Sequence, residues 1–116
     1  KRFLYCKKGV TEHFPFDDVT LVFKVMGKIF LLTGLNSWEN GGPRINLKCN
    51  PEKAIELRES YEDITAGWHM SKKHWNTVAL HSGSISDEFV LELINHSYEL
   101  VISGLTKKIK EALNDM

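Results

Sequence analysis

Residues 19–35 read VTLVFKVMGKIFLLTGL, and this stretch decides the fold. From Val19 to Met26, every second side chain is apolar, and the side chains between them are of mixed polarity. This alternation is the period of a half-buried β-strand. Gly27-Lys28 matches a two-residue hairpin turn of the glycine-first type, and Ile29–Leu35 returns as the partner strand. We therefore expect an antiparallel sheet that is built outward from this hairpin.

A third strand is predicted after the polar, glycine-rich loop 36–43. Alternation is most regular from residue 44 to residue 49, so the two sides of this strand are easily assigned. Ile45, Leu47 and Cys49 are expected to face the core. The opposite side carries Arg44, Asn46 and Lys48. The sheet should therefore have one core face and one polar, cationic face.

Helix signals bracket the predicted strands. Asn50-Pro51-Glu52 is typical of a helix start and predicts a helix to about Ser60. Strands are expected over 64–70 and 75–80, and a short helix over 1–8. Ser86 is expected to cap a long helix that ends at Ser103, and Thr106 a final helix to about residue 114. The long helix has apolar residues at helical spacing, which indicates one buried side.

These elements predict an α+β fold in the order α-βββ-α-ββ-α-α. Strands joined by tight turns and bracketed by helices favour a two-layer sandwich, with an antiparallel sheet and helices packed on one face. At 116 residues and 42% hydrophobic composition, residues 1–116 are expected to form a single domain. The Phe14-Pro15-Phe16 segment is expected to plug one end of the core.

The chain shows no signal for a membrane or for export. Its longest purely apolar run is Ile29–Leu32, which is far too short to cross a bilayer. No leader is recognised, and Cys6 and Cys49 belong to no paired-cysteine motif, so we expect free thiols in a cytoplasmic protein. Because the chain starts at Lys1 within a predicted helix, we expect a few residues to precede it.

Charge is balanced overall, with 15 basic and 15 acidic residues, but it is unevenly distributed. Residues 19–51 hold four bases and one acid, and residues 64–86 hold two bases and no acid. Residues 52–63 hold two bases against five acids, and residues 87–106 hold four acids and no base. Since the basic segments are the predicted strands and the acidic ones are helices, we expect a basic sheet side and an acidic helical side.

Residues 68–78 are the most distinctive stretch of the chain and read WHMSKKHWNTV. Two tryptophans, two histidines and two lysines lie within eight positions, and cations beside flat rings suit an anionic, planar partner such as nucleic acid. The alternative is that Trp68 and Trp75 belong to the core and that the lysines occupy a solvated turn. The stretch alone leaves both interpretations open.

Motifs for catalysis and for cofactors are not found. The sequence contains no phosphate-binding glycine loop, dinucleotide fingerprint, nucleophile elbow or zinc-protease helix. His69 and His74 are five positions apart without a nearby carboxylate, so neither a metal site nor acid–base catalysis is supported. We therefore predict no enzymatic activity, no cofactor, no metal and no small-molecule substrate.

Several separated segments together resemble the MmcQ/YjbR family of small bacterial proteins, from about Tyr5 to Leu113. They are residues 9–12 with 14–16, 22–25, 43–48, 67–77, 96–98 and 100–101. The departures are small: Trp68 stands where tyrosine is common, Ser71 where asparagine is common, and His13 where an acid is common. None of them removes a base from the expected binding surface.

The resemblance implies a compact fold related to secretion chaperones and similar to the iron-binding CyaY proteins. It also implies a DNA-binding protein with a double-wing arrangement and no enzymatic activity. The acidic ridge that iron binding would need is not evident here.

Two functions are most consistent with these observations, ahead of a third alternative, an enzyme of a kind without a recognised motif. The first is sequence-tolerant DNA binding by a non-enzymatic protein through the basic sheet and its turns. Its candidate residues are Arg44, Lys48, Trp68, His69, Lys72, Lys73, His74 and Trp75. The second is a protein-interaction or self-association module of the secretion-chaperone-like kind, which the zero net charge favours. Either way the expected state is a monomer or a weak homodimer.

Overall fold

One antiparallel sheet forms the centre of the computed structural model, which describes residues 2–67, 70–80 and 84–116. In these ranges its strands lie in the order β1-β2-β3-β4-β6-β5. The strands are β1 (Val10–His13), β2 (Thr20–Val25), β3 (Lys28–Gly34), β4 (Arg44–Lys48), β5 (Ile64–Ala66) and β6 (Trp75–Ala79). The helices are α1 (Arg2–Tyr5), α2 (Leu35–Glu39), α3 (Pro51–Ser60), α4 (Asp87–Ser103) and α5 (Lys107–Asn114).

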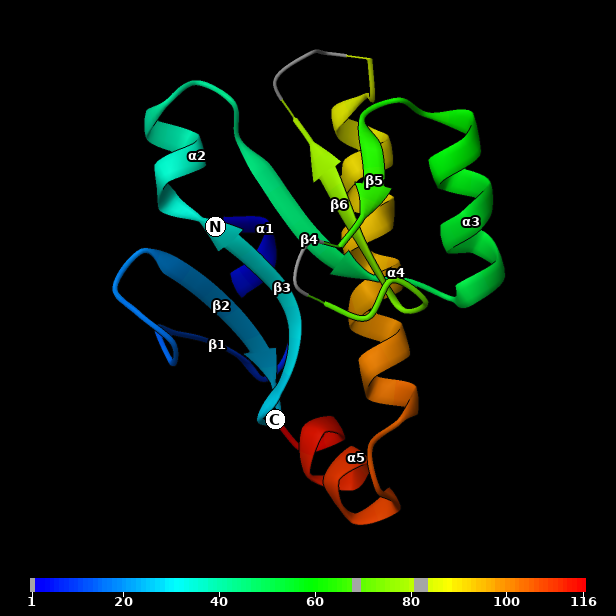
Figure 1. Cartoon of the computed structure of the whole chain (residues 1–116). Helices are drawn as coiled ribbons and strands as arrows, with labels where there is room; N and C mark the ends of the chain where they lie inside the picture. The colour runs from blue at the N-terminus through cyan, green and yellow to red at the C-terminus, as the bar shows by residue number, and fades with distance from the viewer. Residues whose placement is uncertain (1, 68–69, 81–83) are drawn as a thin grey trace.

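The predicted α+β fold is confirmed. Figure 1 looks onto the sheet with α4 behind it, and the predicted elements follow one another in the predicted order. Two short elements, β1 and α2, are additional. No helix in the described part of the chain is long and apolar enough to cross a bilayer.

The β2–β3 hairpin is present, but its turn differs from the one predicted. Val25 pairs with Lys28, so the two loop residues are Met26 and Gly27 rather than Gly27 and Lys28. Both have positive φ angles, 49° and 82°. This is the type I′ geometry, whose twist matches that of the flanking strands and which favours glycine at the second loop position.

An irregularity in β3 places an extra side chain on the helical side. The register with β2 shifts so that Phe23 pairs with Leu31 and Lys24 with Ile29, which leaves Phe30 unpaired. Phe30 is fully buried and meets the ring of Tyr98 on α4 edge to face, with 5.5 Å between the centroids. The bulge therefore directs two successive apolar residues toward α4.

Ser97 of α4 bridges the strands beside this bulge. Its hydroxyl donates to the carbonyl oxygen of Phe30 (2.5 Å) and accepts from the backbone amide of Lys48 (2.9 Å). Ser97 is fully buried. Without its hydroxyl, these two backbone groups would be shielded from water and would lack a hydrogen-bond partner.

The alternation of β4 is confirmed. Ile45 and Leu47 are buried in the core beneath α4. The opposite side of the sheet, here called the open face, carries the other residues of β4 and their cross-strand neighbours. Its members include Val22, Lys24, Leu32, Arg44, Asn46, Lys48, Trp75 and Thr77. Val22 and Leu32 are buried even on this face.

The predicted caps of the later helices are confirmed. The side chain of Asn50 accepts from the amides of Glu52 and Lys53 at the start of α3. Ser86 caps α4 and Thr106 caps α5 in the same way. These bonds satisfy amides that have no partner within the helix, and so they define where each helix begins.

The prediction for the Phe14-Pro15-Phe16 segment is wrong. Phe14 is 48% exposed and Phe16 is 65% exposed, so neither ring plugs the core. The preceding residues 10–13 form an edge strand, which directs the segment outward beyond the sheet. We call this segment the aromatic loop.

Candidate functional site

Cross-strand pairing brings Lys48 and Trp75 side by side on the open face. The two residues are register partners in the β4–β6 ladder, and both are half-buried. The turn before β6 lies directly beside this pair. The amide of Cys49, which follows Lys48, donates to the carbonyl oxygen of His74, which precedes Trp75 (2.8 Å). Lys72, Lys73 and His74 are exposed in this turn, next to the Lys48–Trp75 pair.

The turn is held by bonds at its base. The carbonyl oxygen of Ser71 accepts from the amides of His74 (3.2 Å) and Trp75 (3.0 Å). From α3, Nη1 of Arg58 donates to the carbonyl oxygen of Lys72 (2.7 Å) and to Oδ1 of Asn76 (3.2 Å). The exposed ammonium groups of the turn are therefore attached to a backbone that the rest of the fold orients.

Trp75 lies against the backbone of Gly67 at the end of the β5–β6 pair. The amide of Gly67 donates to the carbonyl oxygen of Trp75 (2.9 Å). A Cβ atom at Gly67 would lie 2.8 Å from Cβ of Trp75 and 3.2 Å from its carbonyl oxygen. Only glycine fits this approach without displacement, so it contributes to the position of Trp75.

Five of the eight predicted site residues are brought together. They are Lys48, Lys72, Lys73, His74 and Trp75. Arg44 lies at the opposite end of β4, where it pairs with Ala79. Arg44 and Lys48 are four residue steps apart along the strand, which corresponds to roughly 13 Å. Trp68 and His69 lie outside the described residues.

Lys24 was not among the site residues predicted from the sequence, although it lies in a segment predicted to be basic. Lys24 lies on the open face of β2 and is the register partner of Ile29 on β3. Since Leu31 pairs with Leu47, Lys24 is at the same end of the sheet as Lys48. We call Lys24, Lys48, Lys72 and Lys73 the basic end. Only the register of three strands shows that these residues share one end.

Acidic side chains are excluded from the segments that build this surface. Residues 19–38, 40–51 and 64–86 contain no Asp or Glu. The acidic segments form α3 and α4, which cover the other face of the sheet. Among the described residues, the structure gives none of the four ammonium groups of the basic end an acidic partner.

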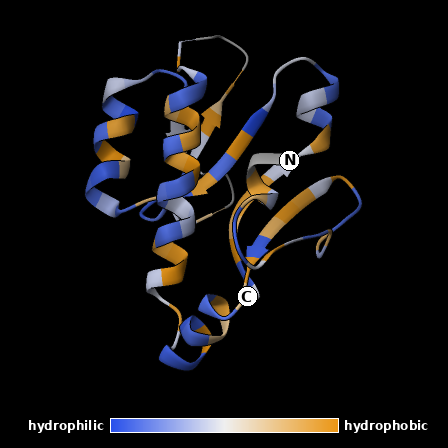
Figure 2. Ribbon diagram, turned by 180° about the vertical axis from the view of Figure 1, so that it is seen from behind, coloured by the Kyte–Doolittle hydropathy of each residue, from blue (hydrophilic) through white to orange (hydrophobic). Residues whose placement is uncertain are grey.

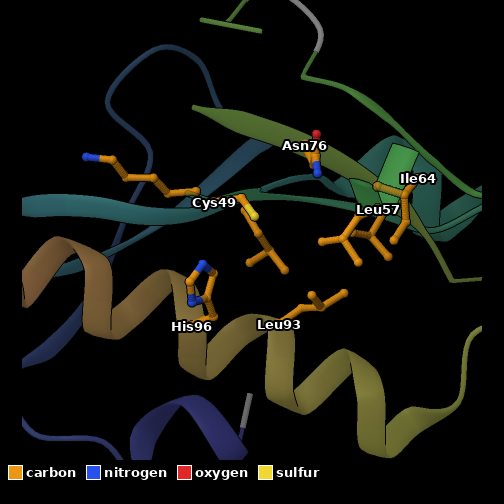
Figure 3. A pocket seen from close by; sticks show the side chains of 9 residues that line it. Cys49, Leu57, Ile64, Asn76, Leu93 and His96 are labelled. Atoms are coloured by element: carbon orange, nitrogen blue, oxygen red, sulfur yellow. The ribbon is translucent and has the colours of Figure 1, made fainter. Parts of the chain in front are cut away.

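A small cavity lies between α4 and the sheet, where His96 and Leu93 point toward Cys49 and Leu57 (Figure 3). Its volume is about 10 Å³, which is at the lower limit for one water molecule. Burial raises the pKa of the Cys49 thiol, which therefore stays protonated and unreactive. This cavity cannot hold a substrate.

His96 has a structural partner in the same region. Its Nε2 accepts a hydrogen bond from the amide of Asn50 (3.3 Å), which requires a neutral ring. Burial, and then the nearby charge of Lys53, lower the pKa of His96, in agreement with this role. Among the described residues, no three His, Cys, Asp or Glu side chains come together to hold a metal ion.

A larger apolar groove opens on the helical side of the sheet, beside α4. Figure 2 shows that side, with α3 and α4 next to one another over one half of the sheet. The groove has a volume of about 400 Å³. It is lined by Leu4, Leu21, Phe23, Leu31, Thr33, Leu35, Trp38, Ile45, Leu80, Val90, Leu91 and Ile94.

The groove has an apolar rim and little polar character. Trp38 is 49% exposed and Leu91 is 37% exposed at its edge. The hydroxyl of Thr33 in the lining accepts from Nε1 of Trp38 (2.7 Å) and donates to the carbonyl oxygen of Arg44 (2.6 Å). Among the described residues that line the groove, none has a charged side chain.

The chain is similar to known proteins over most of its length. It is 42% identical over 95 residues to the protein YbdF of Escherichia coli O157:H7, covering 81% of this chain and 74% of YbdF. It is 34% identical over 111 residues to YjbR of Escherichia coli K12, covering 94% of this chain and 91% of YjbR. Neither name states an activity.

Solved structures give the same result. The crystal structure of Deinococcus radiodurans protein DR2400 matches with a TM-score of 0.88 at 36% identity, over 97% of this chain and 83% of that one. A Pseudomonas syringae protein matches with a TM-score of 0.65 at 27% identity, over 78% of this chain and 86% of that one. The family model YjbR matches residues 6–100. The chain belongs to the YjbR family.

Proposed function

We propose that this protein is a non-enzymatic DNA-binding domain that contacts phosphates through the basic end. One observation carries the proposal: lysines from β2, β4 and the turn 71–74 share one end of the open face. Ammonium groups without acidic partners are suited to neutralising phosphates, and they release condensed counterions when they do so.

Binding through this surface should tolerate changes of DNA sequence. Lysine acts as a point charge, whereas base recognition in a groove relies on bidentate side chains such as arginine and asparagine. Asn46 is the amide on this face, and its Oδ1 already accepts from the hydroxyl of Thr77 (2.6 Å). Trp75 adds a half-buried aromatic residue beside Lys48, whose ring would stack on an unpaired base.

The decisive experiment is an anisotropy titration of labelled duplex and single-stranded DNA over a series of salt concentrations. With about four phosphate contacts, log Kd should change with log salt by a slope of magnitude roughly 3 to 4 on duplex DNA. The Lys72→Ala/Lys73→Ala variant should reduce this magnitude by nearly 2, since about 0.9 is lost for each contact.

Matched controls separate this site from general charge. Lys107→Ala/Lys108→Ala removes two adjacent exposed lysines from α5 and should leave the slope unchanged. Trp75→Ala should weaken binding by about 1–3 kcal/mol without changing the slope if the ring stacks on a base, and its melting curve shows whether it remains folded. If both lysine pairs behave alike, or if DNA does not bind at low salt, the proposal is wrong.

A self-association module is the second candidate function. The observation that favours it is the pair of exposed rings in the aromatic loop, together with an uncharged groove on the helical side. Exposed apolar surface of this kind is common at protein–protein contacts.

A further inference from the structure

The aromatic loop has a restrained backbone beside its two exposed rings. Asp17 accepts hydrogen bonds at Oδ1 from the amides of Val19 (3.0 Å) and Thr20 (2.7 Å), which fixes the backbone just after Phe16. Pro15 restricts the backbone between the two rings. Two large apolar side chains are thus presented to solvent from a restrained segment, so little conformational entropy would be lost when they bind.

The apolar groove has the size and chemistry to accept these rings. An apolar cavity of about 150 Å³ can take up one benzene molecule, and the groove offers about 400 Å³, enough for two phenyl rings. The Thr33 hydroxyl already has both partners, so among the described lining side chains it is not free to orient a polar ligand. Apolar side chains are therefore the better match.

The loop and the groove are neighbours at the same end of the sheet. The amide of Leu35, a groove residue, donates to the carbonyl oxygen of Val19, which follows the aromatic loop (2.7 Å). If two copies are related by a two-fold axis close to this point, each can offer its loop to the other's groove. Such a contact is closed, because the same surface is used on both copies.

We propose that two copies of this chain form a weak two-fold dimer, in which Phe14 and Phe16 of each copy enter the apolar groove of the other. This proposal rests on the second candidate function and names its surfaces and its partner. It does not involve the basic end. The interface is small and rotational and translational freedom is lost on association, so we expect a dissociation constant between about 1 μM and 1 mM.

Sedimentation velocity of the full chain without nucleic acid tests the proposal over that concentration range. The wild type should shift from monomer to dimer as concentration rises. Phe14→Ser/Phe16→Ser and Leu91→Glu should each raise the dissociation constant by about tenfold or more relative to the wild type. Ile55→Ser is the matched control, because Ile55 is 51% exposed on α3, away from the groove. It should dimerise like the wild type.

A mixing experiment distinguishes loop-in-groove pairing from other contacts. Phe14→Ser/Phe16→Ser keeps an intact groove, and Leu91→Glu keeps an intact loop. A mixture of the two can form one complete contact, so it should contain more dimer than either variant alone at the same total concentration. All four proteins are compared by their melting curves, and the mutated side chains are at least one-third exposed, so unfolding is not expected.

Three results would overturn the proposal. One is a wild type that stays monomeric up to about 1 mM. Another is a mixture that contains no more dimer than its components. The third is uptake of the uncharged dye N-phenyl-1-naphthylamine by a strictly monomeric wild type, lost in Leu91→Glu, which would identify a small apolar ligand as the occupant. Failure of DNA binding would leave the dimer prediction intact.

Discussion

Ser97 shows how one small side chain can connect both layers of the fold. It is a polar residue among the buried residues of α4. Its hydroxyl satisfies the carbonyl oxygen of Phe30 and the amide of Lys48, at the bulge in the β2–β3 ladder and just beyond the last pair of β3 with β4. A hydrophobic residue at this position could fill the space but could not make either bond.

We predict that Ser97→Ala lowers the free energy of unfolding by about 1–3 kcal/mol, because two buried backbone groups lose their partner. Urea denaturation followed by circular dichroism measures this difference. Ser103→Ala is the control: its hydroxyl also bonds to a backbone carbonyl oxygen, that of Leu100, but in an exposed position. Equal effects of the two substitutions would contradict the role assigned to Ser97.

Sequence patterns predicted those elements whose burial has a clear period. β2, β4 and α4 each place apolar residues at regular spacing, and α3 has an unmistakable cap at Asn50. β1 has no such signal, because three of its four residues are exposed and it forms only by pairing with β2. α2 has five residues and no side-chain cap, which explains why its segment was assigned to a loop.

The candidate site was predicted in composition but not in arrangement. Alternation correctly assigned Arg44 and Lys48 to one face, but it could not show that Arg44 lies at the opposite end from Lys72 and Lys73. That information is contained in the pairing of Lys48 with Trp75. The bulge at Phe30 and the outward path of the aromatic loop likewise depend on tertiary contacts rather than on local pattern.

At the scale of elements, the β5–β6 pair depends on the absence of a side chain at Gly67. We predict that Gly67→Ala destabilises the protein by about 1–3 kcal/mol, because the new methyl group would overlap Trp75. Gly34→Ala is the matched control: Gly34 has a φ of −83° and open space around it. It should be neutral or stabilise by about 0.4–1 kcal/mol. Thermal unfolding measures the stability of both variants. If Gly34→Ala were destabilised more than Gly67→Ala, this account would be wrong.

The molecule as a whole segregates charge between its two layers. Its net charge is zero, yet the open face and its turns are basic while α3 and α4 carry most of the acidic residues of the central segments. A polyanion therefore meets attraction on one side and repulsion on the other. Both forces weaken beyond a Debye length, which is about 8 Å at physiological ionic strength.

We predict that Glu92→Lys/Glu99→Lys leaves DNA affinity nearly unchanged at physiological salt, since these α4 residues lie across the sheet, about 10 Å or more from the basic end. At low salt, where the Debye length reaches about 30 Å, the same variant should bind DNA more tightly. The anisotropy titration described above measures both. A large gain of affinity at physiological salt would place the DNA on the helical side instead.

The two-residue turn at Met26-Gly27 also has a consequence for the order in which the protein assembles. Only a two-residue loop has to close before β2 and β3 pair. Hairpins of this kind form within about 1–10 μs. β4 and β6 pair across the intervening α3 and β5, which costs more chain entropy. Ser97 and Phe30 meet across 67 positions. We therefore expect the hairpin to be part of the folding nucleus and α4 to dock late, so that contacts of α4 govern chiefly how fast the native protein unfolds.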